Sequence, residues 1–356
     1  MPPRPEKAPW WLREAALILL GVALVAAYVI QAGASEVATH LQDLSVAAIA
    51  LAVAVNLLGW VPRIASYHAV AASTLTGTSW RQSAHASLAA NGANLVLPAR
   101  LGDVALVVDL SRRATVARSI ATVAAWRALS TLALLLLAGA TLAALLVPRL
   151  VPWPAWAILA AAFLIGFGLV VFVAQSGTRL AATWMRRRAD RFATAVGQAT
   201  TGPPVLLPMR ALAASLLAAS LAWALEVASA AVVLASLAPA TPWPHIVMAS
   251  LAGLAAKALR FTPGGIGLYE GMFAGVLWGL GVEGSTAVTA GILSGLVSNL
   301  VTLALGARSA AGLLGTGSLA TLRHLRERPW HEAAPAPGED AADGNDEARA
   351  EGLGRP

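Results

Sequence analysis

The sequence predicts an all-α fold, a polytopic bundle of transmembrane helices, on three observations. Of the 356 residues, 58% are hydrophobic and only 12% are charged, whereas soluble domains carry about a quarter charged residues. The mean hydropathy is +0.69. Long apolar runs recur along the chain, and arginine-containing segments separate several of them. The lipid bilayer is therefore the solvent for most of this chain.

Six apolar runs are long enough to cross a hydrocarbon core of about 30 Å as helices, which rise about 1.5 Å per residue. Two further apolar regions, 80–108 and 245–280, contain Pro, Gly and charged residues that interrupt a uniform membrane helix. Irregular backbone survives at membrane depth only inside protein or beside water, so we expect two broken, re-entrant helical hairpins there. The six full spans are residues 12–30, 44–62, 119–147, 153–174, 209–237 and 285–307.

The distribution of arginine predicts the orientation of these spans. Cationic residues precede the first span, follow the second from Arg63 onward, and fill the loop 179–191. The connectors 31–43 and 238–245 contain no Lys or Arg. By the positive-inside rule we predict a multi-pass protein of the cytoplasmic (inner) membrane with both termini in the cytosol.

The C-terminal segment differs in composition from the rest of the chain. Beyond Pro329 it is rich in Ala, Pro, Gly, Asp and Glu, and it is too polar to bury a core. We therefore divide the chain into a transmembrane domain, residues 1–317, and a cytosolic, mostly disordered tail, residues 318–356.

The two interrupted regions share a short pattern. Residues 97–103 read Leu-Pro-Ala-Arg-Leu-Gly-Asp, and residues 262–267 read Thr-Pro-Gly-Gly-Ile-Gly, with Glu270 three residues later. The charge rule brings the first region in from the cytosol and the second from outside, so the pair would form an inverted repeat. Free N–H groups at a half-helix N-terminus after Pro263 and Gly264 suit a phosphate or carboxylate. A plain helix–helix turn is the alternative interpretation.

Polar side chains within these regions are candidate binding residues. Lys257 and Arg260 share a helix face, as do Asn91 and Asn94, and we expect both pairs to face a cavity. A charge at the bilayer centre costs at least about 2.5 kcal/mol, which favours paired, inward positions. Structural ion pairs and snorkelling to the interface are the alternatives. The candidate acidic partners are Asp103, Glu226 and Glu270.

Arg127 and Glu226 each lie in a long apolar run. For both residues, a buried pair between helices and a contact with substrate remain open interpretations. Trp126, which precedes Arg127, is expected to pack.

With these motifs the chain resembles the flippase-like transmembrane region of the lysylphosphatidylglycerol synthases. The resemblance rests on residues 91–103, on 119–137 with Arg127, and on 263–270, and it extends over about residues 12–314. It implies a lipid-translocating bundle. The residues that match the family motifs of the lipid pathway are Pro98, Arg100, Gly102, Pro263, Gly264, Gly267 and Glu270.

The chain also departs from the family pattern. Asp103 stands where the family commonly has Glu, Trp126 and Ser130 replace acids on either side of Arg127, and residues 294–295 lack an arginine often found there. The aminoacyl-transferase domain of two-domain members is missing after the last span. We therefore do not expect synthesis of an aminoacyl-lipid.

We expect a lipid flippase or lipid transporter that moves a polar, anionic headgroup across the membrane. The expected partner is a membrane lipid, either a phospholipid or a polyprenyl-phosphate-linked lipid. The candidate substrate-binding residues are Asn91, Asn94, Pro98, Arg100, Asp103, Arg127, Lys257, Arg260, Pro263, Gly264, Gly267 and Glu270.

Two other functions remain open. One is a non-catalytic membrane scaffold that partners a glycosyltransferase or lipid-modifying enzyme. The other is a membrane-embedded lipid transferase, which needs an acid–base constellation, and His85 has no acidic neighbour in the sequence.

Enzymatic, cofactor and nucleic-acid roles are not expected. The chain has no cysteine, and its six histidines show no metal-ligand spacing. No nucleotide-binding Gly-Lys-Ser/Thr loop follows the Pro-Gly-Gly motif. The net charge of +7 arises largely from arginines in short loops, which indicates membrane orientation rather than binding of nucleic acid.

Overall fold

The computed structural model describes residues 10–96, 101–150, 207–259 and 262–314, and these residues form helices and turns without a strand. The predicted all-α class is therefore confirmed. The helices are α1 (Trp10–Ala32), α2 (Ala34–Gln42), α3 (Val46–Thr74), α4 (Trp80–Val96), α5 (Leu101–Leu110), α6 (Val116–Leu150), α9 (Met209–Leu237), α10 (Trp243–Leu259), η2 (Pro263–Gly265), α11 (Leu268–Gly279) and α12 (Gly284–Leu314).

Four of these helices, α3, α6, α9 and α12, are long and apolar enough to cross a membrane. The α1–α2 pair, which bends by 94°, supplies up to a fifth span. Gly33 separates its two helices with a φ of 92°, a conformation that only glycine adopts readily. The connector predicted after the first span is thus largely helical. The predicted span 153–174, the loop 179–191 and the tail 318–356 lie outside the described residues.

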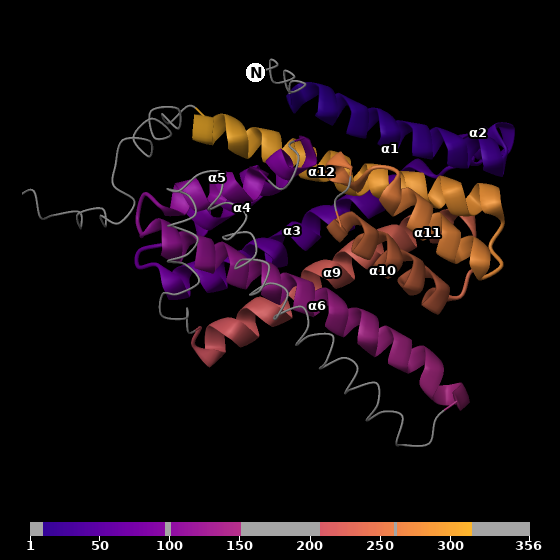
Figure 1. Ribbon diagram of the computed structural model, residues 1–356. Coiled ribbons are helices and arrows are strands. Elements are labelled where there is room, and N and C mark those ends of the chain that lie inside the picture. Colours follow the sequence, from indigo (N-terminus) through magenta and orange to yellow (C-terminus); the bar gives the residue numbers. More distant parts are fainter. Residues whose placement is uncertain (1–9, 97–100, 151–206, 260–261, 315–356) are drawn as a thin grey trace, which may run out of the picture.

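Helices α3 and α9 pack side by side through the middle of the bundle (Figure 1). The Ser229 hydroxyl donates to the Ala52 carbonyl at 2.8 Å. The hydroxyls of Ser66 and Ser215 are 3.0 Å apart. From the first contact to the second, the residue number rises along α3 and falls along α9, so the two helices run antiparallel.

Helix α3 extends further than the sequence predicted. The second span was expected to end at Pro62 with Arg63 in the cytosol, but the helix continues to Thr74 with Pro62 inside it. Membrane helices tolerate proline because neighbouring groups satisfy the freed carbonyl. The placement of Arg63 was therefore wrong. It lies within the bundle, where Glu226 of α9 neutralises it.

The first interrupted region forms two helices that pack against each other as a hairpin. Helix α4 begins with a capping box, in which Ser79 and Gln82 each bond the other's backbone N–H, at 3.1 and 3.3 Å. The chain breaks after Val96 and returns as α5. Arg113 then donates to the Gln82 side chain at 2.6 Å, which places the end of the hairpin beside its start.

The second interrupted region, α10 and α11, forms a matching hairpin. Its helices pack closely, because a Cβ on Gly253 of α10 would lie 2.9 Å from the Tyr269 ring of α11. The turn between them needs glycine, since Gly264, Gly265 and Gly267 have φ values of 65°, 73° and 84°. Gly264 lies against Leu95 of α4, so the tips of the two hairpins meet.

Each half of the bundle has the same order of elements. A 29-residue helix, α3 or α9, precedes a 17-residue helix, α4 or α10. A break, a short helix of 10 or 12 residues and a long helix of 35 or 31 residues follow. Because the first helices of the two halves run antiparallel, this arrangement agrees with the predicted inverted repeat.

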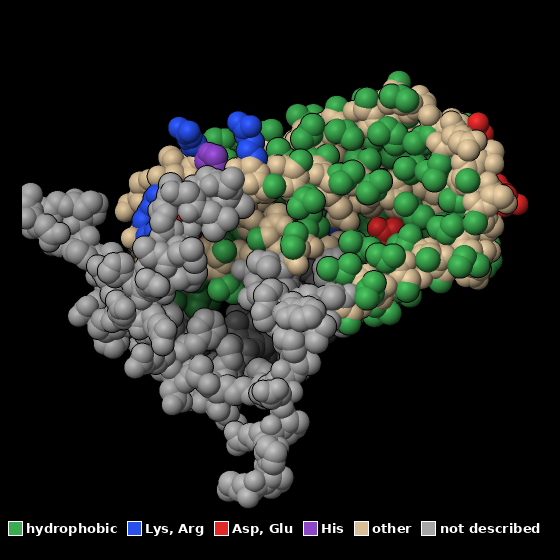
Figure 2. All heavy atoms as spheres, turned by 90° about the horizontal axis from the view of Figure 1, so that it is seen from above, with side chains coloured by type: hydrophobic (Ala, Val, Ile, Leu, Met, Phe, Trp, Pro, Cys, Tyr) green, Lys and Arg blue, Asp and Glu red, His purple; other side chains and the backbone are tan. Residues whose placement is uncertain are grey.

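Charges separate toward the two ends of the described bundle. Figure 2 shows Lys and Arg near one end, Asp and Glu at the other, and between them a broad hydrophobic face that contains a further acidic patch. The exposed arginines at the first end are Arg81, Arg112, Arg113, Arg118, Arg210 and Arg308. The exposed acids at the second end are Glu36, Asp43 and Glu283. The apolar face between the ends has the character of a lipid-facing belt.

Candidate functional site

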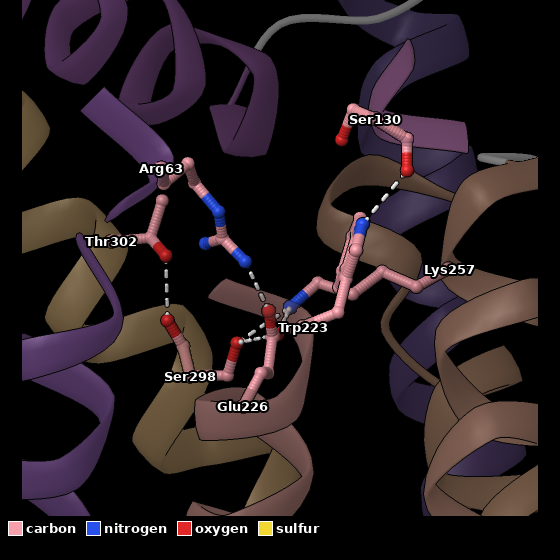
Figure 3. A network of polar contacts seen from close by, with 7 residues as sticks. All are labelled: Arg63, Ser130, Trp223, Glu226, Lys257, Ser298 and Thr302. Atoms are coloured by element: carbon pink, nitrogen blue, oxygen red, sulfur yellow. Dashed lines mark hydrogen bonds and ion pairs between the residues drawn. The ribbon is translucent and has the colours of Figure 1, made fainter. Parts of the chain in front are cut away.

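Glu226, near the middle of α9, is the centre of a buried polar network (Figure 3). Its Oε2 forms an ion pair with Arg63 of α3. Its Oε1 accepts a hydrogen bond from the Ser298 hydroxyl of α12 at 2.9 Å and lies 3.7 Å from the Lys257 Nζ of α10. Lys257 in turn donates to Ser298 at 2.8 Å. Four helices from both halves therefore share one carboxylate.

Two tryptophans flank Arg63. Its guanidinium carbon lies 4.9 Å from the ring centroid of Trp60 and 5.2 Å from that of Trp223, distances that allow cation–π attraction. The Trp223 Nε1 donates to the Ser130 carbonyl of α6 at 2.9 Å. The Trp60 Nε1 is buried and has no hydrogen-bond acceptor among the described residues. The indole N–H of Trp223 therefore has an acceptor among the described residues, whereas that of Trp60 has none.

These residues occupy equivalent positions in the two halves. Trp60 and Trp223 are each the fifteenth residue of a 29-residue helix, and Arg63 and Glu226 each follow three positions later. The Arg63–Glu226 pair therefore lies across the pseudo-twofold axis that relates α3 to α9. One half supplies the cation and the other the anion.

A second, partly buried ion pair fixes the first hairpin. Arg127 of α6 binds both carboxylate oxygens of Asp103, with its Nε 3.1 Å from Oδ2. The Asn94 amide donates to Asp103 and accepts from the Gly102 backbone, each at 2.9 Å. The guanidinium of Arg127 also lies 4.1 Å from the ring centroid of Trp126. These bonds join α4, α5 and α6 where the hairpin turns back.

Glu270 lies in the first turn of α11, as Asp103 lies in the first turn of α5. Its Oε2 accepts a hydrogen bond from the backbone N–H of Gly267 at 2.6 Å and thereby caps α11. The opposing helix carries Gly295 where a Cβ would collide with the other carboxylate oxygen. Glu270 therefore stabilises the N-terminus of the returning helix.

A polar cavity of about 110 Å³ opens beside the Glu226 network. This volume holds several water molecules or one small polar group. Its three lining cations, Arg63, Arg127 and Lys257, outnumber its single lining acid, Glu226. The lining residues are Trp60, Arg63, Asn91, Leu95, Trp126, Arg127, Ser130, Thr131, Leu134, Trp223, Glu226, Leu254, Lys257, Ser298 and Thr302.

An apolar cavity of about 390 Å³ lies next to the polar cavity. Leu95 lines both, so this one side chain is part of the wall between them. The residues that line the apolar cavity are Val22, Val25, Leu95, Val96, Gly264, Ile266, Glu270, Ile292, Leu296, Asn299, Leu300 and Leu303.

The structure brings only part of the predicted site together. Asn91, Arg127 and Lys257 line the polar cavity, whereas Gly264 and Glu270 line the apolar cavity. Pro263 belongs to the turn η2. The predicted residues Pro98, Arg100 and Arg260 lie outside the described residues.

One expectation about these residues was wrong and another was confirmed. Asn94 does not line the polar cavity with Asn91, because its amide binds Gly102 and Asp103 at the start of α5. Of the three acids proposed as partners of Lys257, Glu226 forms the ion pair. Asp103 instead holds Arg127.

Sequence reasoning missed four residues of the network: Trp60, Arg63, Trp223 and Ser298. A repeat search that included the spans could have found the first three, because Trp60-x-x-Arg63 matches Trp223-x-x-Glu226 in spacing. Arg63 was misplaced because a proline precedes it and further arginine follows in the sequence.

The hairpins and buried ion pairs lie in a region that a known family shares. A family model described as the lysylphosphatidylglycerol synthase TM region matches residues 17–306. The chain belongs to this family. The match covers both hairpins and every residue that lines the two cavities. A comparison with curated proteins gave no significant match.

Proposed function

We propose that the protein is a lipid flippase or lipid transporter that moves a lipid with a polar, anionic headgroup across the cytoplasmic membrane. The observation that supports this most is the pair of adjoining cavities, one cationic and one apolar, which share Leu95. A lipid has the same two parts, a polar headgroup and a hydrocarbon chain. Membership of a membrane family related to lipid metabolism agrees with a lipid substrate.

The polar cavity offers a charged headgroup a favourable place inside the bundle. A charge at the centre of a bilayer costs at least about 2.5 kcal/mol, and paired groups or cavity water reduce that cost. Arg63 and Lys257 lie near the middle of the bundle and already hold one carboxylate, that of Glu226. The same side chains can attract the anion of a headgroup.

The two hairpins suit transport because they enter the bundle from opposite ends and their tips meet at Leu95 and Gly264. In transporters built from inverted repeats, broken helices frame a central site, and movement of one half against the other exposes it to each side in turn. The chain carries no nucleotide-binding loop, so we propose that movement is driven by a gradient or runs downhill.

The arginine-rich end of the bundle faces the cytosol in this proposal, with both termini on that side. The protein itself catalyses no covalent reaction. A partner membrane enzyme, such as a glycosyltransferase, would supply or use the lipid.

Reconstitution in liposomes tests the proposal. We would measure movement of a headgroup-labelled anionic phospholipid between leaflets with a membrane-impermeant quencher. Wild-type protein should accelerate this movement, and Lys257→Met should abolish the acceleration because the cavity then loses a cation. Arg210→Met is the matched control, because Arg210 is exposed at the end of the bundle and should leave the rate unchanged.

Two outcomes would argue against transport. Equal rates of phospholipid movement for Lys257→Met and wild type would show that the movement does not depend on the polar cavity. No acceleration by wild-type protein, together with loss of a co-purifying membrane enzyme's activity when the protein is deleted, would favour the scaffold function.

A further inference from the structure

We propose that Trp60 and Arg63 form the binding site for one phosphate-type oxyanion in the polar cavity. This inference rests on the proposed function and names the chemical class that the same cavity takes. Both residues lie on α3 at the pseudo-twofold axis, one turn apart, and both line the cavity.

The first observation is the unused donor of Trp60. The side chain is 3% exposed, and its Nε1 has no hydrogen-bond acceptor among the described residues. A buried N–H without an acceptor is uncommon in folded proteins and calls for a specific explanation. Since Trp60 lines a polar cavity, an acceptor supplied by a ligand explains it.

The inverted repeat shows where an acceptor would otherwise be. Trp223, the equivalent tryptophan, donates to the Ser130 carbonyl, and Ser130 is the fifteenth residue of α6. The fifteenth residue of α12 is Ser298. Its carbonyl accepts from Thr302 at 2.7 Å instead. The repeat thus satisfies Trp223 and leaves Trp60 with its donor unused.

The second observation is the guanidinium of Arg63. It carries five N–H donors, and its one hydrogen bond among the described residues uses Nη2 toward Glu226. The ring centroids of Trp60 and Trp223 lie 4.9 and 5.2 Å from its carbon, and both rings can hold it by cation–π attraction. Its remaining N–H groups and the Trp60 N–H can bind adjacent oxygens of one oxyanion.

The charge of the lining indicates the sign of the ligand. Three of the residues that line the polar cavity are cations, Arg63, Arg127 and Lys257, and one is an acid, Glu226. This lining favours an anion. A phosphodiester is an anion of this kind, and the cavity of about 110 Å³ has room for such a small group.

Binding to the purified full-length protein tests the site. The probes are dihexyl phosphate, which has a phosphodiester and two chains, dimethyl phosphate, which lacks the chains, and inorganic phosphate. Calorimetry would measure the affinity of each. Trp60→Phe should weaken binding of dihexyl phosphate about tenfold or more, the loss expected for a hydrogen bond to a charged group.

Trp243→Phe is the matched control, because it makes the same chemical change at a tryptophan that is 63% exposed and lines neither cavity. It should leave the affinity within about threefold of wild type. Arg63→Lys should also weaken binding, because an ammonium cannot bind two oxygens in a planar fork.

The remaining outcomes are decisive. Equal affinity in wild type and Trp60→Phe overturns the site. If dihexyl phosphate binds more tightly than dimethyl phosphate, the source of the oxyanion is a lipid. If inorganic phosphate binds as tightly as dihexyl phosphate, the source is a free anion. Trp60-dependent binding without lipid movement in liposomes would refute the proposed function and leave the site standing.

Discussion

Replacing Glu226 with glutamine removes the carboxylate on which the polar network depends. The substitution preserves the size of the side chain but leaves Arg63 and Lys257 without their shared anion. Breaking a buried ion pair by removing one partner costs about 3–5 kcal/mol. The Arg63 and Lys257 side chains are 20% and 18% exposed, so we expect the lower end of that range.

Thermal unfolding in detergent, followed by circular dichroism, measures this loss. About 3 kcal/mol corresponds to a fall in melting temperature of roughly 6–12 °C for a domain of this order of size. A fall of less than about 2 °C would refute the conclusion that Glu226 holds the two cations inside the bundle.

A charge swap probes the same network through its symmetry. Arg63→Glu combined with Glu226→Arg restores an acid–base pair across the pseudo-twofold axis. It also moves the carboxylate from α9 to α3, away from Lys257 and Ser298. We expect the double variant to recover about half of the stability that Arg63→Glu alone loses, because one of two cation contacts returns. No recovery would contradict the assigned symmetry.

Three further predictions address packing, register and orientation. Gly306→Val should destabilise the protein by about 2 kcal/mol or more, because even a Cβ there would collide with the backbone of α4; thermal unfolding measures it. Ser66→Cys with Ser215→Cys should form a disulfide on mild oxidation, since the two hydroxyls are 3.0 Å apart, and gel mobility reports it. In intact cells an impermeant maleimide should label Glu283→Cys and spare Arg81→Cys, because arginine-rich ends face the cytosol.

The packing and disulfide predictions each have a control within the chain. Gly275→Val should be tolerated, because a Cβ at Gly275 meets no atom within 4 Å. Ser66→Cys with Ser229→Cys should not form a disulfide, since Ser229 bonds Ala52 farther along α3. Equal stability of the two valine variants or a disulfide in the control pair would contradict the structure. Labelling of Arg81→Cys alone would contradict the proposed orientation.

The sequence predicted the elements of the fold that depend on local pattern. Long apolar runs predicted the spanning helices, and the prolines and glycines at 98–102 and 263–267 predicted where two helices break. The glycines of the second break have positive φ, which explains why the motif needs them. The antiparallel relation of the two halves followed from arginine placement, because charge distribution records which way each segment crosses.

The contacts of the site could not be predicted in the same way. Lys257 had three candidate acids in the sequence, and only the register of α9, α10 and α12 decides for Glu226. Arg63 resembled a residue at the end of a helix, because proline and arginine usually mark such ends. Its burial depends on an acid 163 residues away in the chain, which no local pattern indicates.

The proposed function requires a wet, polar cavity near the middle of the membrane, and cysteine accessibility measures it most directly. The chain contains no native cysteine, so Ser130→Cys places one thiol in the polar cavity. Leu221→Cys places one on the apolar outer face at nearly the same depth, where the native side chain is 54% exposed in the bundle and would be covered by lipid. We predict that a small, charged thiosulfonate reagent modifies Ser130→Cys in membranes and that dihexyl phosphate slows this reaction. Modification of Leu221→Cys with no modification of Ser130→Cys would show that the outer face is wet and the cavity dry, and would contradict the account.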